Sequence, residues 1–322
     1  MGSFKKKRRK IRYALLVAVI KVLVALIRVL PRKVAMALGG SLGTLIFRLM
    51  KGERRKTVTN LTTAYGRDKS AAAIAAMARE VWRNLGKSGV EFAIRMGQET
   101  PEDFFRDLEV HGNEHLQAAH AQGKGILGLM SHMGCWEGMA LALPMLGIPT
   151  TAVGKKLANE RLNALVFEFR GKKGVSTLAR GSSYKAILQV LRENNLIAIL
   201  IDQDTDVRGV FVDFYGKPAY TPIGAAMLAM DSSAPVLPMF YLKKPDDTFM
   251  FIIEKEIPLV RTGNRREDME ENTRRFHRVI EKYIKEYPTQ WVWMHNRWKT
   301  RPEVLEKKKK RKAVGRRATG GN

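Results

Sequence analysis

From Gly123 onward, short apolar runs alternate with amphipathic stretches, and this alternation constrains the fold more than any other feature of the sequence. The amphipathic stretch from Asn159 to Gly171, for example, separates two apolar runs. Strands that alternate with helices favour parallel pairing, because each connecting helix crosses one face of the sheet. We therefore predict the α/β class, with a central, largely parallel sheet flanked by helices. The predicted strands are ILGLM (126–130), TTAVG (150–154), LIAILI (196–201), PVLPMFYL (235–242) and FMFII (249–253).

The rest of the chain predicts helices and one continuous domain. Residues from Ser70 to Gly97 combine strong helix formers with apolar positions at spacings of three and four, which predicts one or two helices. The sequence contains no internal repeat and no long linker rich in Pro, Gly or Ser between Gly52 and Pro302. We expect a folded domain over 51–302, after an N-terminal region (1–50) and before a basic tail (303–322).

The segment from Tyr13 to Pro31, YALLVAVIKVLVALIRVLP, is predicted to be a hydrophobic membrane-anchor helix. It is about as long as a bilayer span, but Lys21 and Arg28 interrupt it. These two charges lie seven residues apart and share one helix face, which makes the helix amphipathic. Such a helix lies in the membrane interface or spans at a tilt, with the preceding basic residues on the cytoplasmic side. A signal peptide cleaved after Ala37 is the less favoured alternative, because charges interrupt its apolar core.

The formal net charge of +26 requires an acidic partner, such as nucleic acid, an anionic membrane, or an acidic protein or substrate. Positive charge is concentrated near both ends, in residues 5–12 and 307–317. Each run is typical of a solvated segment, but the first one abuts the predicted anchor. No nucleic-acid-binding module is recognisable in the body. We therefore expect an anionic membrane and no nucleic acid; a non-enzymatic, basic membrane-binding protein is kept as an alternative.

Cysteine and histidine content limits other kinds of chemistry. The single cysteine, Cys135, excludes an intramolecular disulfide and agrees with a body in the reducing cytosol. A thiol nucleophile at Cys135, activated by His132, would give a thioesterase or cysteine hydrolase, which we keep as a second enzyme class. His111, His115 and His120 lie close in sequence, but no carboxylate completes a convincing ligand set. We predict no metal site and no cofactor.

The stretch GKGILGLMSHMGCWEG places polar side chains directly after a buried strand. Catalytic groups of open α/β sheets gather beyond the carboxyl ends of strands, where His132 falls. Glu137 follows five residues later, a spacing that on a regular helix turns the two side chains about 140° apart. The two can meet only if His132 precedes the helix and bends back over its first turn. A carboxylate on one imidazole nitrogen would leave the other to take a proton from a hydroxyl; the alternative is a capping glutamate and an ordinary histidine.

Several blocks of sequence, in the right order, resemble one protein family. HMGCWEG (132–138) resembles the HxxxxE motif of the lysophospholipid acyltransferase superfamily, and its glycine and tryptophan resemble those of the lipid A lauroyl/myristoyl acyltransferase branch. The other blocks are RRKTVTNL (54–61), DQDTDVRGVFVDFYGKPAYTPIGAAMLA (202–229) and PTQWVWMHNRWKTRP (288–302). The sequence departs from the pattern at Cys135, where the family commonly has asparagine.

This resemblance implies a bacterial inner-membrane enzyme whose catalytic domain lies on the cytoplasmic side. It would transfer a fatty acyl group from an acyl carrier protein thioester to a hydroxyl of a lipid A precursor. His132 would activate that hydroxyl and Glu137 would orient His132. Arg170 matches an arginine thought to contact phosphate or the developing oxyanion, two tasks that suit a planar guanidinium. Another glycolipid or a lysophospholipid is the alternative acceptor.

Three further side chains are predicted to bind substrate. Asp202 and Gln203 follow a predicted strand and should reach the same strand end as His132, where both can hydrogen-bond sugar or phosphate. The alternative is that they cap the loop that follows. Arg297 lies in a cluster of tryptophans after the amphipathic helix over 266–287, and it is a candidate to recognise an acceptor phosphate. For the tryptophans we favour closure of the sheet together with interfacial anchoring.

Overall fold

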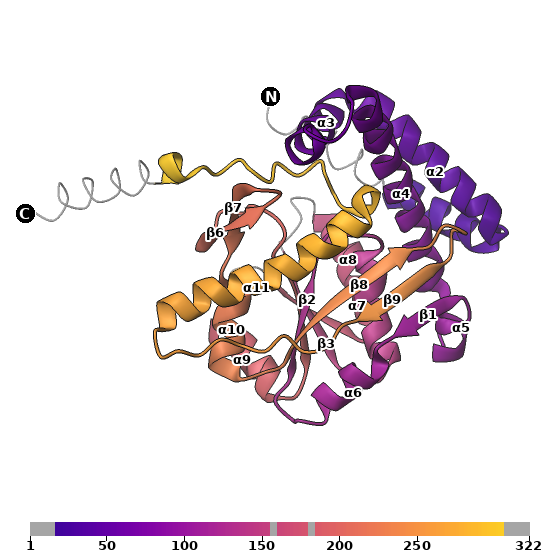
Figure 1. The fold of residues 1–322 in the computed structure, drawn as a ribbon. Helices are drawn as coiled ribbons and strands as arrows, with labels where there is room; N and C mark the ends of the chain where they lie inside the picture. The colour runs from indigo at the N-terminus through magenta and orange to yellow at the C-terminus, as the bar shows by residue number, and fades with distance from the viewer. Residues whose placement is uncertain (1–16, 155–159, 180–183, 306–322) are drawn as a thin grey trace, which may run out of the picture.

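The computed structural model describes residues 17–154, 160–179 and 184–305, and its centre is a seven-stranded sheet (Figure 1). In spatial order, the strands are β1 (Leu108–His111), β9 (Phe249–Ile253), β8 (Val236–Lys243), β2 (Ile126–Met130), β5 (Leu196–Leu200), β3 (Thr150–Gly154) and β4 (Val175–Ala179). The five strands from β8 to β4 are parallel, whereas β9 is antiparallel to β8 and pairs in parallel with β1. The predicted α/β class and the largely parallel sheet are confirmed, and so are all five predicted strands.

Helices cover both faces of this sheet. Successive side chains of a strand point to opposite faces, so an apolar strand needs apolar partners on both sides. In β2, Leu127 and Leu129 enter one apolar cluster, while Ile126 and Met130 enter the other. The first cluster includes residues of α9 (Tyr184–Arg192), α10 (Gly224–Ser232) and α11 (Arg265–Glu286). The second includes residues of α5 (Pro101–Phe105), α6 (Asn113–His120) and α7 (Trp136–Met145). Helix α8 (Glu160–Lys172) lies between β3 and β4 in the sequence. Strands β6 (Gly209–Phe214) and β7 (Lys217–Pro222) form a separate hairpin. The short helix η1 (Pro288–Gln290) follows α11.

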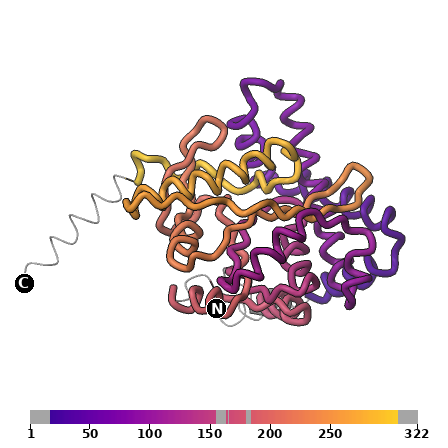
Figure 2. Tube along the Cα trace, turned by 60° about the horizontal axis from the view of Figure 1, so that its bottom comes forward, coloured from indigo at the N-terminus to yellow at the C-terminus, as the bar shows by residue number. Residues whose placement is uncertain are grey.

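The N-terminal helices gather at one flank of the molecule, drawn in indigo to purple in Figures 1 and 2. They are a helix over residues 17–29, α2 (Arg32–Leu49), α3 (Lys51–Tyr65) and α4 (Ala71–Gly97). Ser70 caps α4 by accepting a hydrogen bond from the backbone N–H of Ala73, and the predicted segment 70–97 forms one helix.

No single helix within the described ranges has the length and hydropathy of a membrane span. Only α2 and α3 together pass this test, as a pair bent by 97°. The predicted anchor helix is therefore not confirmed. Its first residues, 13–16, lie outside the described part of the chain, and so do both basic terminal runs.

Glycines allow α2 and α4 to pack in close contact. A Cβ atom added at Gly43 would lie 2.1 Å from the carbonyl oxygen of Trp82, and one added at Gly86 would lie 2.1 Å from the carbonyl oxygen of Gly39. Real Cβ contacts are never this short, so the backbones of the two helices approach to a distance that only glycine permits. This contact fixes α2 firmly to α4.

We expect Gly86→Ala to destabilise the protein by about 1–3 kcal/mol, because the added methyl group forces α2 away from α4. Gly89→Ala, one turn further along the same helix, is the matched control, since a Cβ at Gly89 has nothing within 4 Å. That change should stabilise by about 0.5–1 kcal/mol through helix propensity alone. Denaturant unfolding of both variants measures the difference; equal effects would show that the helix contact tolerates a side chain.

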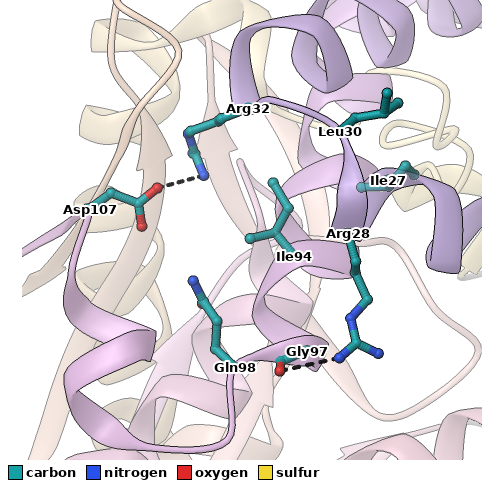
Figure 3. Close-up of a pocket in the computed structure, with 8 residues that line it drawn as sticks. All are labelled: Ile27, Arg28, Leu30, Arg32, Ile94, Gly97, Gln98 and Asp107. Atoms are coloured by element: carbon teal, nitrogen blue, oxygen red, sulfur yellow. Dashed lines mark hydrogen bonds and ion pairs between the residues drawn. The ribbon is translucent and has the colours of Figure 1, made fainter.

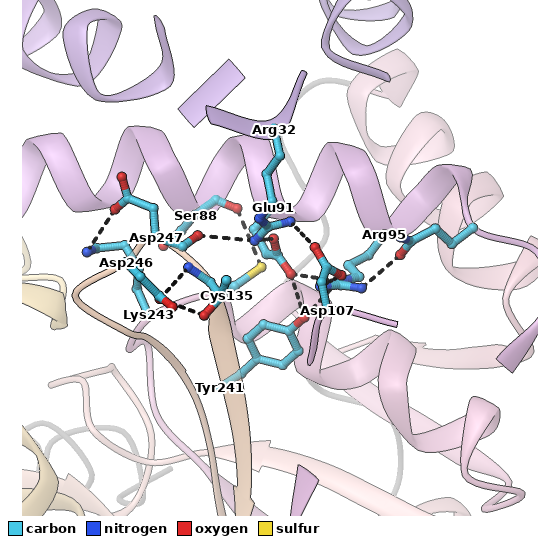
Figure 4. A network of polar contacts seen from close by, with 12 residues as sticks. Arg32, Ser88, Glu91, Arg95, Asp107, Cys135, Tyr241, Lys243, Asp246 and Asp247 are labelled. Carbon is cyan, nitrogen blue, oxygen red and sulfur yellow. Dashed lines mark hydrogen bonds and ion pairs between the residues drawn. The ribbon is translucent and has the colours of Figure 1, made fainter. Parts of the chain in front are cut away.

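A buried ion-pair network joins α2, α4 and β8 (Figure 4). The fully buried Glu91 pairs with Arg95 at 2.6 Å and with Arg32 at 2.6 Å, and it accepts a hydrogen bond from the hydroxyl of Tyr241 at 2.8 Å. Asp107 pairs with both arginines, at 2.8 Å and 2.7 Å. A buried carboxylate is costly unless it is paired, so these contacts specify how α2 and α4 attach to the sheet.

Candidate active site

His132 and Asp202 emerge side by side from adjacent strands. β2 and β5 pair in parallel with Met130 opposite Leu200, so the second residue after each strand lies at the same carboxyl edge. Nδ1 of His132 lies 2.9 Å from Oδ1 of Asp202, and the backbone N–H of His132 donates to Oδ2 at 2.8 Å. The predicted placement of Asp202 beside His132 at the strand ends is therefore confirmed.

The turn that carries His132 depends on Gly134. This glycine has a φ of +54°, and a Cβ there would lie 1.9 Å from a carbonyl oxygen of β8. The C-terminal segment crosses the same turn: the N–H of Gly134 donates to Gln290 O at 2.8 Å, and the N–H of Val292 donates to His132 O at 3.1 Å. His132 thus lies between the sheet and the C-terminal segment, before α7 begins at Trp136.

Asp202 is fully buried and its two oxygens are engaged by protein donors. Oδ2 also accepts a hydrogen bond from Nε1 of Trp291 at 2.8 Å, a contact that sequence reasoning missed. Burial raises the pKa of a carboxyl, but the charge of His132 and the hydrogen bonds from His132 and Trp291 outweigh it and lower the pKa of Asp202 to about 2. Asp202 is therefore an ionised carboxylate that orients His132, a different task from the predicted contact with sugar or phosphate.

The bond to Asp202 fixes the tautomer of a neutral His132. A carboxylate only accepts, so Nδ1 carries the proton and Nε2 carries the lone pair. Nε2 makes no hydrogen bond to any described residue, and the side chain is 26% exposed. Trp136 packs edge-on against the ring, with centroids 5.6 Å apart. An accessible lone pair on an oriented imidazole is what a general base requires.

Glu137 and Arg170 form a second charged pair. The guanidinium of Arg170, on α8, donates to both carboxylate oxygens of Glu137, on α7, with Nη2 at 2.8 Å from Oε1 and 2.9 Å from Oε2. Within the described ranges no hydrogen bond joins Glu137 to His132. The structure brings Glu137 to Arg170 and His132 to Asp202, and the catalytic role of Glu137 stays a prediction.

Gln203 and Arg297 have different surroundings. Gln203 is half-buried, and its substrate contact stays a prediction. Arg297 is fully buried; its guanidinium donates to Tyr220 O and to Thr221 Oγ1, and lies 3.0 Å from Nε2 of His277. Burial lowers the pKa of Arg297 to about 10. These partners give Arg297 a structural task, joining the C-terminal segment to β7 and α11, while its predicted phosphate contact is untested.

Trp291 and Trp293 are fully buried, and the expectation that they anchor the protein at a membrane interface is wrong. The indole Nε1–H of Trp293 donates to Pro288 O at 2.6 Å, and the Trp291 ring packs edge-on against Phe214 and Trp293. The predicted structural role, closing the fold, describes both side chains.

We expect acid to destabilise the protein through His277. Burial, and next the charge of Arg297, hold the pKa of His277 well below its usual value, so below about pH 6.5 the unfolded chain binds a proton that the folded chain does not. Stability should then fall by about 1.4 kcal/mol per pH unit for this group as pH decreases. Denaturant unfolding between pH 7.5 and 5.5 should show a shallower pH slope for His277→Gln than for wild type. An unchanged slope, matching that of the exposed control His111→Gln, would contradict this explanation.

Cys135 does not fit the role of a nucleophile. It is fully buried, its Sγ donates to Ser88 O at 3.4 Å, and burial, with Glu91 nearby, raises the pKa of its thiol well above the usual value. His115 hydrogen-bonds Ile253 O, and no group of metal-binding side chains occurs in the described ranges. The geometry favours neither thiol chemistry nor a histidine metal site.

The fold and the site define an α/β protein with a histidine–aspartate pair at the carboxyl edge of its sheet. A sequence model described as bacterial lipid A biosynthesis acyltransferase matches residues 1–300, and the chain belongs to this family, as the sequence blocks predict. A lipid A biosynthesis acyltransferase of Haemophilus influenzae is 26% identical over 86% of each chain. A lipid A biosynthesis lauroyltransferase of Escherichia coli (strain K12) is 29% identical over 85% of this chain and 88% of its own. A phosphatidylinositol mannoside acyltransferase of Mycobacterium tuberculosis (strain H37Rv) is 29% identical over 41% of this chain and 43% of its own.

Proposed function

We propose that this protein transfers a fatty acyl group from an acyl carrier protein thioester to a hydroxyl of a lipid A precursor, with His132 as the general base. The observation that carries the proposal is the 2.9 Å contact between His132 Nδ1 and the buried carboxylate of Asp202. It presents Nε2 as the proton acceptor and places a negative charge where the imidazolium will form. Membership of the acyltransferase family supports the reaction class.

The reaction follows from these two side chains. Nε2 of His132 takes the proton of the acceptor hydroxyl as its oxygen attacks the thioester carbonyl. The tetrahedral intermediate then collapses, the carbon–sulfur bond breaks, and the imidazolium returns the proton to the departing thiolate. Asp202 stabilises the imidazolium throughout, because its carboxylate stays ionised. No cofactor is needed for this balance of atoms and charges.

Arg170 is proposed to bind a phosphate of a substrate or the developing oxyanion. Glu137 holds the guanidinium from one side with a bidentate ion pair, which fixes its direction. In this proposal, Glu137 acts on the reaction through Arg170. Gln203, which follows Asp202 directly, is proposed as an additional hydrogen-bonding group for the acceptor headgroup.

The proposed acceptor follows the relatives that match most of the chain. The relatives from H. influenzae and E. coli are named for lipid A biosynthesis and match 86% and 85% of this chain. The M. tuberculosis relative, named for phosphatidylinositol mannoside, matches 41%. We therefore propose that the enzyme acts in lipid A biosynthesis. The acyl carrier protein and the lipid acceptor would meet at the cytoplasmic side of the inner membrane.

Lipid analysis of a deletion strain tests this proposal. Mass spectrometry of total lipids should show that lipid A loses one secondary acyl chain in the deletion strain. Wild type should restore that chain and His132→Ala should not. Unchanged lipid A together with an altered phospholipid or another altered glycolipid would refute the proposed acceptor. The altered lipid would then be the acceptor class of this enzyme.

A further inference from the structure

The carboxylate of Asp202 accepts hydrogen bonds from two separate parts of the described chain. Oδ1 faces Nδ1 of His132 at 2.9 Å, whereas Oδ2 accepts from the backbone N–H of His132 and from Nε1 of Trp291, each at 2.8 Å. Both donors of His132 belong to the residue whose ring Asp202 orients. Among the described residues, Trp291 is therefore the donor that ties the carboxylate to a different part of the fold.

The indole ring of Trp291 has little freedom to move. It is fully buried and packs edge-on against the rings of Phe214 and Trp293, with centroids 5.5 Å and 4.8 Å away. The backbone of Trp291 also forms a β-bridge with Met133. Close packing of this kind holds a side chain in one rotamer, so the N–H is directed at Asp202 before any substrate binds.

The segment that carries Trp291, residues 288–297, is attached to the fold on both sides of this side chain. Before it, the side chain of Gln290 exchanges two hydrogen bonds with the backbone of Lys243, at the end of β8, both at 2.8 Å. After it, Nδ2 of the buried Asn60, on α3, donates to two carbonyl oxygens further along the segment, at 2.7 Å and 2.6 Å. The sheet and α3 together thus fix the position of the indole N–H.

Trp291 holds a negative charge without neutralising it. Cations hold carboxylates elsewhere in the protein; Asp107, for example, lies 2.8 Å from Nη1 of Arg32 at the wall of a cavity of about 290 Å³ (Figure 3). Within the described ranges, Asp202 forms no ion pair with an arginine or a lysine. The charge of Arg297 is near enough to interact with it, but that guanidinium gives its hydrogen bonds to β7 and α11. A neutral donor leaves the charge of the carboxylate available to the imidazolium that forms during the reaction.

We propose that Trp291 is a positioning residue for acyl transfer: its indole N–H holds the carboxylate of Asp202 so that Oδ1 stays directed at His132. This role depends on the proposed function of His132 as the general base. The C-terminal segment then contributes to catalysis, because Trp291 orients Asp202 and Asp202 orients His132. Without the N–H, the carboxylate can rotate about its Cβ–Cγ bond, and the imidazole is directed less well at the acceptor hydroxyl.

Steady-state kinetics of Trp291→Phe test this role, because phenylalanine keeps an aromatic ring and removes the N–H donor. With an acyl carrier protein thioester and a partly acylated lipid A precursor, kcat should fall about ten to a hundredfold, the effect of one hydrogen bond to a charged group, while KM for both substrates stays unchanged. Trp293→Phe is the matched control, since this neighbouring buried indole donates to Pro288 O. The control should keep the kcat of wild type. Equal losses of kcat in the two variants, or an unchanged kcat in Trp291→Phe, would overturn the proposal.

A second replacement separates the loss of the donor from the loss of packing, because phenylalanine leaves space where the larger indole ring lies. A tryptophan analogue in which sulfur replaces the ring N–H, incorporated at position 291, keeps the shape of the side chain. It should show the same loss of kcat, with a free energy of unfolding close to that of wild type. Wild-type turnover with this analogue would overturn the proposal, whatever the stability of Trp291→Phe.

The proton on Nδ1 of His132 reports the position of Asp202 directly. In protein labelled with ¹⁵N-histidine, its NMR signal should lie downfield in wild type and in Trp293→Phe, because this N–H donates to a carboxylate, and should move upfield in Trp291→Phe. An unmoved signal would show that Asp202 keeps its orientation without Trp291, and would overturn the proposal. Near-normal turnover of His132→Ala is a separate outcome, which would refute the proposed general base.

Discussion

Replacing His132 with alanine should lower acyl transfer by about a hundred to ten thousandfold, because no other described group is placed to take the acceptor proton. Of the two ring nitrogens of His132, Nδ1 is bound to Asp202, and Nε2 makes no hydrogen bond to a described residue. Nε2 is therefore the nitrogen that can accept the proton of the acceptor hydroxyl. Turnover is measured with purified enzyme, an acyl carrier protein thioester and a partly acylated lipid A precursor. A variant with near-normal turnover would exclude His132 as the general base.

The fold of His132→Ala should survive, which makes this variant informative. Asp202 keeps the backbone N–H of residue 132 and Nε1 of Trp291 as donors, so its carboxylate is not left unpaired. The hydrogen bond from the backbone N–H of Val292 to the carbonyl oxygen of residue 132 is also unaffected by the substitution. Circular dichroism and vesicle binding equal to those of wild type are the necessary controls.

Replacing Asp202 with asparagine should lower turnover by about a thousand to ten thousandfold while leaving the site geometry nearly intact. The amide oxygen can still accept one hydrogen bond, but the negative charge that stabilises the imidazolium is lost. An amide NH₂ group facing Nδ1 would also favour the opposite tautomer, which leaves Nε2 protonated and unable to act as a base. Turnover is measured in the same assay.

Asp204 provides a matched control for this substitution. Asp204 lies two residues after Asp202 in the same loop and is also fully buried. Its carboxylate, however, accepts hydrogen bonds from the backbone N–H of Thr300 at 2.8 Å and from the hydroxyl of Thr300 at 3.0 Å. Asp204→Asn should therefore cost stability without a comparable loss of turnover by the folded enzyme. Equal losses of turnover in the two variants would mean that the loop as a whole matters, and not the bond between Asp202 and His132.

The strands of the sheet centre could be predicted because their residues are apolar without interruption. A strand buried on both faces, such as β2, shows this pattern directly in the sequence. β1 and β4 carry polar and exposed residues at the edges of the sheet, and neither was predicted. The β6–β7 hairpin was missed although Tyr215 and Gly216, both with positive φ, form its turn and the preceding strand is rich in valine and phenylalanine. A run of strand-forming residues that ends before a glycine turn was a usable signal.

The candidate site was predictable only where strand ends define it. His132 and Asp202 each follow a recognisable strand, so their meeting could be inferred from parallel pairing. The bond from Trp291 to Asp202 joins residues 89 positions apart, and no local pattern indicates it. The pairing of Glu137 with Arg170 depends on how α8 packs beside α7, which periodicity does not specify. Sequence reasoning therefore placed His132 correctly at the strand ends but paired it with a different carboxylate from the one that it contacts.

The tautomer of His132 tests this account most directly. Selective ¹⁵N labelling of histidine, with His132→Ala to assign the signals, reports by NMR which ring nitrogen carries the proton near neutral pH. Because the carboxylate of Asp202 accepts from Nδ1, we expect a protonated Nδ1 and an unprotonated Nε2 in wild type and in Glu137→Gln, and loss of this preference in Asp202→Asn. A wild-type ring protonated at Nε2, or a tautomer that changes with Glu137→Gln and not with Asp202→Asn, would contradict it.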